Sequence, residues 1–413
     1  MTARTRAWIL VAVLWVVFTL NYLDRQVIFS IFPPLKKDLN LTDYELGLIG
    51  AVFLWVYGFL SPFAGYLGDR FSRSKIIVFS LVVWSLVTWL TGYVRSFGEL
   101  ILARGLMGIS EAAYLPAAVA LLADHHDNKT RSRAIGMHQS GIYVGILLGG
   151  VGGGWIADRY GWRSVFTFLG LAGVVYAVFA ARFVLRTGQY HTPQRLTERL
   201  SMWSALKELL GIRNFVILCS INAVTSIGWW MVFNWLPTHL YERFKLTLTD
   251  AGFTATFYLQ VVGIFGILVG GVIADRWSLV SPRGRLLVQV IGLLSAAPFL
   301  FVIGQTHSYP ILIASLILCG AGRGFFDCNT VPVMCQFVRP ELRSTAWGMY
   351  TCMSCLCAGA FVALAGKFKE TLGLGGAFQI AAGLVFLCGL SLLTVRFGSG
   401  PEDSGALSRA KLP

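Results

Sequence analysis

The chain has 413 residues, of which 56% are apolar and only 13% are charged, and its mean hydropathy is +0.67. Soluble domains carry about 25% charged residues, so this composition excludes an ordinary soluble protein and indicates a polytopic membrane protein. The formal net charge is +14, but the basic residues are spread over short intervals between apolar segments instead of forming one patch. We therefore expect membrane lipids, and no nucleic acid, among the partners.

Long apolar segments follow one another along almost the whole sequence. A membrane-crossing helix needs about 20 mostly apolar residues, and twelve segments meet this requirement. They cover approximately residues 7–32, 44–68, 76–94, 97–122, 134–157, 163–185, 214–240, 251–274, 286–304, 309–336, 345–366 and 372–395. These segments are too long and too continuously apolar for the alternating pattern of a membrane β-barrel. The sequence therefore predicts an all-α membrane protein with twelve transmembrane helices.

The basic residues predict the orientation of the chain. Cytoplasmic loops carry an excess of Lys and Arg, and 22 of the 34 basic residues fall in the two tails and in the loops after even-numbered helices. Both termini are therefore expected in the cytoplasm. The first apolar segment follows Arg4 and Arg6, but it is too long and too polar for a secretory signal and lacks a small-x-small cleavage site. We interpret it as an uncleaved first helix.

The sequence contains two related halves. The longest polar interval between helices runs from Arg186 to Arg213 and divides the predicted helices six and six. Three short matches occur in the same order in both halves, which is the signature of an internal repeat. The matches are GYLGDR (65–70) with GVIADR (271–276), RSRAIGM (131–137) with RSTAWGM (343–349), and Arg104-Gly105 with Arg323-Gly324.

The repeat predicts three regions of the chain. They are a six-helix bundle at residues 1–187, a cytoplasmic linker at 188–212 and a second six-helix bundle at 213–413. Two such bundles can open a central site alternately to the two sides of a membrane.

The loop after the second predicted helix carries a motif. The segment GYLGDRFSRSK at residues 65–75 resembles the GxLxDRxGRxx motif of the major facilitator superfamily, with Ser72 where that family usually has glycine. A charged cytoplasmic loop alone could contain such a segment, but the second copy and the twelve helices favour the family. The resemblance covers essentially the whole chain and implies two pseudo-symmetric six-helix bundles. Gating or structural roles are predicted for Gly65, Asp69, Arg70, Arg73, Asp275, Arg276 and Arg323.

Charged residues inside the predicted helices are the strongest candidates for function. Each costs roughly 2.5–3.5 kcal/mol at a helix centre, so such residues usually face a cavity and pair with one another. They are Asp24 and Arg25 in the first helix, Arg104 and Glu111 in the fourth, and Arg323 and Asp327 in the tenth. In the major facilitator superfamily the first, fourth, seventh and tenth helices line the central cavity. The resemblance therefore implies that these charges converge there.

Local sequences narrow the family further. NYLDR at 21–25 and RGLMGISEA at 104–112 resemble the anion:cation symporter family, which carries sugar acids and other carboxylates. WWMVFNWLPT at 229–238 looks like the seventh helix of that family, including its W-x-P-T ending. The NYLDR and Arg-Gly…Glu-Ala patterns also occur in Spinster-like lipid transporters, and GFFDCN at 324–329 matches neither family well. Both subfamilies therefore stay open.

A coupling mechanism follows from placing two carboxylates in a half-dry cavity. Burial disfavours the charged form of a carboxyl group and a nearby arginine favours it, so Asp24 and Glu111 can bind and release protons. The planar fork of Arg25 suits a substrate carboxylate, and the resemblance to the symporters implies these same roles. The alternative is that Arg25–Glu111, Asp24–Arg104 or another combination forms permanent structural ion pairs. For Arg104, substrate contact and gating or structural pairing both stay open.

Further polar side chains complete the predicted site. Gln139 and Tyr143 are four residues apart on one face of the fifth helix, and such groups orient a ligand by hydrogen bonding. The preceding His138 is either a titrating group or a packing residue. The predicted substrate contacts are Tyr22, Arg25, Arg104, Tyr114, Gln139, Tyr143, Asn234, Asp327 and Asn329.

These observations predict a transporter and not an enzyme. The sequence has no GxxxxGK[ST] nucleotide loop, and we expect no cofactor and no metal site, with protons as the coupling ion. The expected function is proton-coupled symport of a small organic anion, a sugar acid or other carboxylate, by a monomer in a bacterial inner membrane. One alternative is a Spinster-like lysolipid exporter. The alternative of another class is a nutrient-sensing transceptor, for which the tails Met1–Arg6 and Gly398–Pro413 are expected to be too short.

Overall fold

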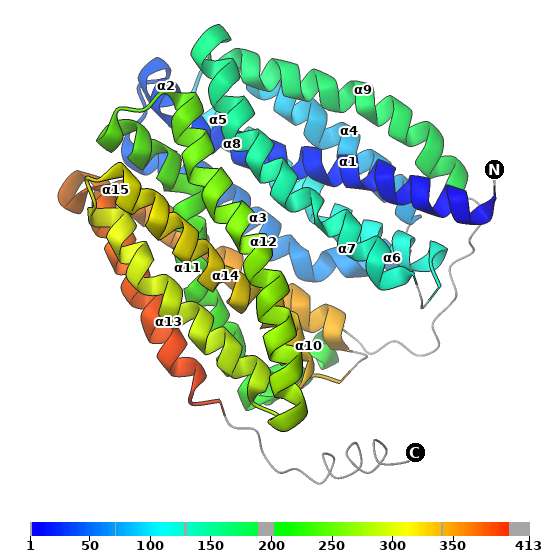
Figure 1. Ribbon diagram of the computed structural model, residues 1–413. Coiled ribbons are helices and arrows are strands. Elements are labelled where there is room, and N and C mark those ends of the chain that lie inside the picture. Colours follow the sequence, from blue (N-terminus) through cyan, green and yellow to red (C-terminus); the bar gives the residue numbers. More distant parts are fainter. Residues whose placement is uncertain (1, 71, 128–129, 189–201, 340–341, 396–413) are drawn as a thin grey trace, which may run out of the picture.

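The protein was analysed as a computed structural model, which describes residues 2–70, 72–127, 130–188, 202–339 and 342–395 (Figure 1). Nearly every residue within these ranges belongs to an α-helix. We call α1–α9 the first half and α10–α15 the second half. The helices of the first half are α1 (Ala3–Ser30), α2 (Phe32–Asp38), α3 (Asp43–Arg70), α4 (Arg73–Thr91), α5 (Phe97–Ala112), α6 (Tyr114–His125), α7 (Arg131–Gln139), α8 (Gly141–Tyr160) and α9 (Trp162–Gly188). Those of the second half are α10 (Met202–Gly211), α11 (Arg213–Phe244), α12 (Leu248–Val280), α13 (Gly284–Gln305), α14 (Tyr309–Cys335) and α15 (Arg343–Leu392).

The prediction of twelve membrane-crossing helices is confirmed. In the described part of the chain, eleven helical segments are long and apolar enough to cross a membrane. The last of them, Thr345–Leu392, has 48 residues, more than twice the length that one crossing of about 20 residues needs. The backbone of Gly373 interrupts it with a φ of 67° and a ψ of 167°, which are not helical values. It therefore forms two crossings, as the predicted segments 345–366 and 372–395 require.

Short helices and breaks refine the predicted spans. The fourth span consists of α5 and α6, which meet at Ala113, and the fifth consists of α7 and α8, which meet at Ser140. The short helix α2 lies after the first span. The helix α10 lies within the interval predicted as a linker, whose residues 189–201 fall outside the described residues. The limits 188–212 of the linker, and with them the bounds of the two bundles, stay a prediction.

The two halves meet along two pairs of helices, α3 with α15 and α8 with α12 (Figure 1). Glycines allow these helices to approach closely, since a side chain would leave no room between the backbones. A Cβ on Gly366 would lie 2.1 Å from the carbonyl oxygen of Asp43, and one on Gly252 would lie 2.0 Å from that of Gly150. We call the end of the bundle that carries α2 the α2 end, and the opposite end the α10 end. Both close approaches lie at the α2 end.

Two glycines at equivalent turns hold a backbone conformation that other residues avoid. Gly161 links the fifth span to the sixth with φ 81° and ψ 159°, and Gly373 links the eleventh to the twelfth. This region of φ and ψ is essentially restricted to glycine, and another residue there costs of order 1–3 kcal/mol. We expect Gly161→Ala and Gly373→Ala each to lower the free energy of unfolding by about 1–3 kcal/mol, measured from unfolding curves in detergent.

A matched control comes from Gly383, a helical glycine with open space at its Cβ position, as at both turns. Gly383→Ala should keep or raise stability, because alanine is the better helix former by about 1 kcal/mol. If the turn variants behaved like Gly383→Ala, these turns would not require glycine.

Candidate functional site

The charged residues of α1 and α5 form a buried ion pair. The Arg25 Nε donates to the Glu111 carboxylate, and the two residues are 7% and 0% exposed. Three aromatic rings surround the guanidinium, with centroids 4.4 Å (Tyr57), 4.8 Å (Tyr22) and 5.0 Å (Phe53) from the Arg25 Cζ. Cation–π attraction is strongest when the cation is shielded from water. The rings therefore fix the guanidinium in one place in the interior.

Two further charges occupy the same buried region. The Arg104 Nε donates to the Ile49 carbonyl of α3 at 3.2 Å, and its guanidinium lies 4.7 Å from the Phe53 ring centroid. Asp24, 3% exposed, lies within electrostatic range of both Arg104 and Glu111. Two carboxylates and two guanidinium groups thus share one region between α1, α3 and α5. Their formal charges balance, which lowers the cost of burying them.

Part of the hydrogen-bonding capacity of this region is unused. The Asp24 Oδ1, the Glu111 Oε1 and the Arg104 Nη2 are buried and find no partner within the described part of the chain. A buried polar atom without a partner costs free energy, so native structures usually provide one. The two carboxylate oxygens can therefore accept a proton or a hydrogen bond, and the Arg104 Nη2 can donate one to a polar ligand, without first breaking a contact.

A second charged group lies on α14. The Arg323 Nε is 3.1 Å from the Asp327 carboxylate, one helical turn away. The Arg323 guanidinium faces the rings of Phe233 and Trp229 of α11, with centroids at 4.6 and 5.7 Å. Tyr143 of α8, in the first half, lies within electrostatic range of Asp327 and Arg323. The Asp327 side chain is 34% exposed, which leaves it accessible to a ligand.

Tyr114 and His138 belong to helix packing in the first half. The Tyr114 hydroxyl donates to the Leu14 carbonyl of α1 at 3.0 Å and lies 3.1 Å from the His138 Nε2. The His138 ring stacks on Phe18, with centroids 4.5 Å apart, and is fully buried. Within the described residues the Tyr114 hydroxyl is thus already occupied, and its predicted substrate contact would require a change of partner.

The remaining predicted contacts lie on other helices. The Asn234 Nδ2 donates to the Trp230 carbonyl at 2.8 Å, and the Asn329 Nδ2 donates to the Phe325 carbonyl at 3.2 Å. Each amide therefore bonds to its own helix. Gln139 ends α7, and its Oε1 has no partner within the described residues. These three side chains are not joined to either charged group by a described contact, and their substrate roles stay predictions.

The motif residues at the α10 end are partly described. Arg73 forms an ion pair with Asp124 of α6, and Asp275 forms one with Arg285 of α13 at 2.8 Å, whereas Arg276 is exposed. The first pair joins α4 to α6, and the second joins α12 to α13. The side chains of the motif residues Asp69 and Arg70 fall outside the described residues, and for Gly65 only the helical backbone of α3 is described.

Phe53 was not among the predicted site residues, and Tyr57, a polar side chain of the second predicted helix, was only a weaker candidate for the pocket. They lie one turn apart on α3, and both cover the Arg25 guanidinium. An aromatic residue in an apolar helix gives no signal alone, because most such rings face lipid or other helices. The signal in the sequence was the i, i+4 spacing of the two rings. It could have been noticed because other predicted helices carry arginines within their apolar segments.

These features define a polytopic membrane protein with charged centres enclosed by two helical bundles. The Major Facilitator Superfamily model matches residues 14–363, and the chain belongs to this family. Its members are transporters, so this protein is a transporter and not an enzyme.

Known relatives agree with both predicted resemblances. The chain is 29% identical to protein spinster homolog 1 of Xenopus laevis, covering 86% of this chain and 71% of that protein. It is 25% identical to GudP of Bacillus subtilis, a probable galactarate/D-glucarate transporter, covering 92% and 91%. The fold matches the crystal structure of a bacterial homologue of the human lysosomal transporter Spinster, in an inward-facing and unoccupied conformation. That match has a TM-score of 0.76 at 19% identity and covers 96% of this chain and 99% of the other.

Proposed function

We propose that the protein is a proton-coupled symporter of a small organic anion that works by alternating access. The observation that carries this proposal is the Arg25–Glu111 ion pair, with Asp24 in the same buried region. A substrate carboxylate that binds the Arg25 fork competes with Glu111 for it. Glu111 would then be a buried carboxylate without its counter-charge, which favours taking up a proton. Anion binding and proton binding are thereby linked.

The charges of the buried region support this exchange, because they balance both before and after the substrate binds. Before binding, Asp24 and Glu111 balance Arg25 and Arg104; afterwards the substrate carboxylate replaces the charge that Glu111 loses on protonation. The net charge of the buried region stays constant, so neither step leaves an isolated charge in a low-dielectric interior. Asp24 provides a second carboxylate for a proton. No cofactor is part of this mechanism.

We propose sugar acids and related carboxylates as substrates, with the α10 end in the cytoplasm of a bacterium and the protein acting as a monomer in the inner membrane. The bidentate geometry of arginine suits a carboxylate, and the relative GudP carries the name of a sugar-acid transporter. The excess of basic residues in the tails and in the loops at the α10 end supports the orientation.

A lysolipid exporter of the Spinster kind is the second candidate. The apolar rings of Phe233 and Trp229 beside Arg323 favour it, since such surroundings suit an amphipathic ligand. Proteoliposome uptake of labelled sugar acids, monocarboxylates and lysolipids, with and without an inward proton gradient, separates the two. Uptake at the same rate with and without the proton gradient would rule out symport.

The variant Asp24→Asn tests the coupling role. It keeps the size of the side chain but cannot carry a proton, so we expect substrate exchange to continue while gradient-driven accumulation is lost. Uptake against a concentration gradient and exchange between equal concentrations are measured on the same proteoliposomes. Asp250→Asn, at an exposed aspartate in the first turn of α12, serves as the matched control and should accumulate substrate normally. Accumulation by Asp24→Asn at the rate of the unmodified protein would remove Asp24 from the coupling mechanism.

A further inference from the structure

A pocket of about 840 Å³ lies at the α2 end of the second half. It is formed by the end of α11, the turn between α13 and α14, and the start of the twelfth span, where residues 372–376 contribute backbone. Its polar side chains are His239, Glu242, Arg243, Gln305, His307 and Gln379. We call it the Arg243 pocket. All of these residues belong to the second half, so the pocket is separate from the seams between the halves and from the charged groups described above.

Arg243 supplies the pocket with a cation that is held in place by neutral partners. Its Nε donates to the Thr306 carbonyl at 3.0 Å. Its Nη2 donates to the Gln305 carbonyl and lies 2.9 Å from the His307 Nε2. The Nη1 makes no hydrogen bond within the described residues and lies 3.6 Å from the position that a Cβ on Gly375 would take. A fixed guanidinium with unused N–H groups suits an oxyanion, to which it can donate charge-assisted hydrogen bonds.

The Arg243 Nη1 lies beside the start of a helix. The backbone of Gly373 is not helical, so the helix of the twelfth span begins after it. The first N–H groups of a helix have no acceptor within that helix, and the helix dipole favours an anion at this end. The guanidinium and the helix start therefore both attract an anion to the same part of the pocket.

A buried histidine is the second, independent sign of a ligand. His239 is 4% exposed, and its Nε2 has no partner within the described part of the chain. Its ring lines the Arg243 pocket and packs edge-on against Phe378, with centroids 5.3 Å apart. Buried polar atoms usually have a partner, and an imidazole nitrogen can donate to, or accept from, an oxygen of a ligand. A ligand in the pocket would supply the missing partner.

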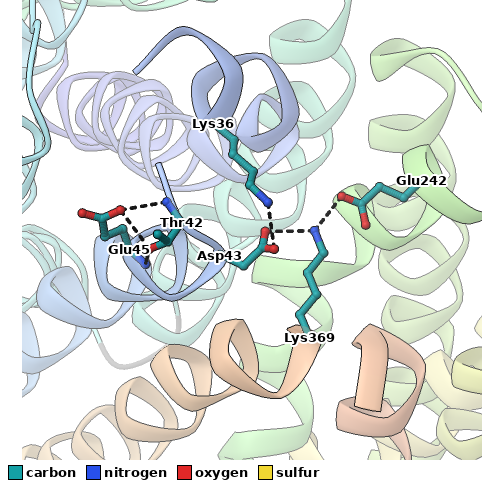
Figure 2. Close-up of polar contacts among 6 residues, drawn as sticks. All are labelled: Lys36, Thr42, Asp43, Glu45, Glu242 and Lys369. Carbon is teal, nitrogen blue, oxygen red and sulfur yellow. Dashed lines mark hydrogen bonds and ion pairs between the residues drawn. The ribbon is translucent and has the colours of Figure 1, made fainter. Parts of the chain in front are cut away.

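Glu242 brings a negative charge to the pocket, but a cation of the chain already balances that charge. The Glu242 carboxylate accepts from the Lys369 Nζ at 2.6 Å (Figure 2). The Glu242 side chain is also 42% exposed, so water and salt screen its interaction with other charges. An anion beside Arg243 therefore meets little repulsion from Glu242.

The first half shows what occupies the corresponding place in its own bundle. Gly161 makes the equivalent turn, and α9 begins directly after it. The Asp38 carboxylate accepts from the Trp162 Nε1 at 3.2 Å and forms an ion pair with Arg163, and both partners belong to the first turn of α9. An acidic side chain of the protein thus lies at this helix start. At the equivalent helix start of the second half there is a pocket instead.

We propose that the Arg243 pocket is a second binding site, which takes a small oxyanion such as phosphate or a carboxylate. The Arg243 guanidinium, the N–H groups after Gly373 and the His239 ring hold this ligand, which takes the place that Asp38 fills in the first half. A free anion and the phosphate of a lipid headgroup offer the same chemistry. The site lies outside the charged region between α1, α3 and α5, so the inference goes beyond the proposed transport function and does not depend on it.

Hydrogen–deuterium exchange on the full-length protein in detergent, with inorganic phosphate as the probe, tests this site. At roughly ten times its Kd, phosphate should slow exchange of amides 374–376 about tenfold, because only the unoccupied protein then exchanges. Arg243→Gln should raise the Kd about tenfold or more, since it removes hydrogen bonds from a charged group. Arg243→Lys, which keeps the charge, should bind phosphate more tightly than Arg243→Gln. His239→Phe keeps a ring against Phe378 and should raise the Kd by about two- to tenfold.

Three control variants separate this pocket from other cations of the protein. Lys367→Gln removes an exposed cation of α15 that does not line the pocket, and it should leave the Kd unchanged. Glu242→Gln removes the negative charge and should keep or lower the Kd. Arg25→Gln combined with Glu111→Gln removes two charges of the other buried region, and phosphate should still protect amides 374–376.

Nanodiscs identify the source of the ligand. Protection of amides 374–376 in phosphatidylglycerol without added phosphate, and not in phosphatidylcholine, would assign the site to an anionic lipid headgroup. Protection by phosphate in detergent would assign it to a free anion. The proposal is overturned if neither phosphate nor phosphatidylglycerol protects these amides, or if Arg243→Gln is protected as well as the unmodified protein. Failure of anion symport would instead appear in the uptake experiments, with this protection unchanged.

Discussion

Replacing Arg25 by glutamine is expected to abolish binding of the anionic substrate and to destabilise the protein by about 3–5 kcal/mol. Both effects follow from its place in the structure. The guanidinium is the partner of Glu111, which is completely buried, and three rings hold it in position. Without it, Glu111 is left as a buried carboxylate that lacks its counter-charge. The measurements are titration calorimetry with sugar acids and unfolding curves in detergent.

A double variant separates the functional role of this pair from a structural one. Arg25→Gln combined with Glu111→Gln removes both charges, so most of the lost stability should return, because neutral partners leave no isolated charge. Substrate binding should not return, because the cationic fork is absent. Full binding or transport by the double variant would show that the pair is only structural.

Two further variants complete the comparison. Arg25→Lys keeps the charge but loses the planar fork, and we expect weaker binding with most of the stability retained. Arg285→Gln removes an arginine from a partly exposed ion pair with Asp275. Such pairs contribute at most about 1 kcal/mol, so this control should bind substrate normally and lose little stability.

The features that could be predicted from the sequence depend on residues that are close to one another along the chain. Continuous apolar length defined the twelve spans, since one bilayer imposes a similar length on each. The one-turn spacing of Arg323 and Asp327 placed them side by side on α14, where the structure joins them. The turn at Gly373 lies just inside the predicted span 372–395, two residues past the interval 367–371 that separated it from the preceding predicted span.

The pairing across helices could not be predicted in the same way. The sequence left open whether Arg25 pairs with Glu111 and whether Asp24 pairs with Arg104. The structure joins Arg25 to Glu111, while the Arg104 Nε turns to the Ile49 carbonyl. Rotations of α1 and α5 about their axes decide this outcome, and those rotations depend on packing against α3 and α8. The pattern of apolar residues cannot predict these rotations, because lipid-facing and buried helix faces are both apolar in a membrane.

The ion pair between Asp43 and Lys369 at the α2 end shows the same limit more strongly (Figure 2). Asp43 and Lys369 are 326 positions apart, and each stands at the boundary of an apolar segment, where charged residues are ordinary. Nothing local distinguishes them from the other charges at segment ends. Only the close approach of α3 to α15, made possible by Gly366 against the Asp43 backbone, brings the two charges together.

The variant Gly252→Ala is expected to prevent the α2 end from closing. Its Cβ would lie 2.0 Å from the carbonyl oxygen of Gly150, and a Cβ on Gly154 would likewise lie 2.3 Å from the carbonyl oxygen of Leu248. Backbone atoms face each other along this stretch of α8 and α12, so no flexible side chain can move aside. Overpacking of this kind costs typically about 1–3 kcal/mol. We therefore expect transport to fall and amide exchange near 244–256 to rise, measured by uptake and by hydrogen–deuterium exchange.

Gly271→Ala lies on the same helix and provides the control, because its Cβ would meet nothing within 4 Å. It should transport normally and gain about 0.5–1 kcal/mol of stability, since alanine loses less conformational entropy in a helix. Normal transport by Gly252→Ala would mean that α8 and α12 never need to approach this closely during the cycle. If instead Gly252→Ala slows transport and raises amide exchange near 244–256 while Gly271→Ala does neither, closure of the α2 end depends on the close approach of α8 and α12.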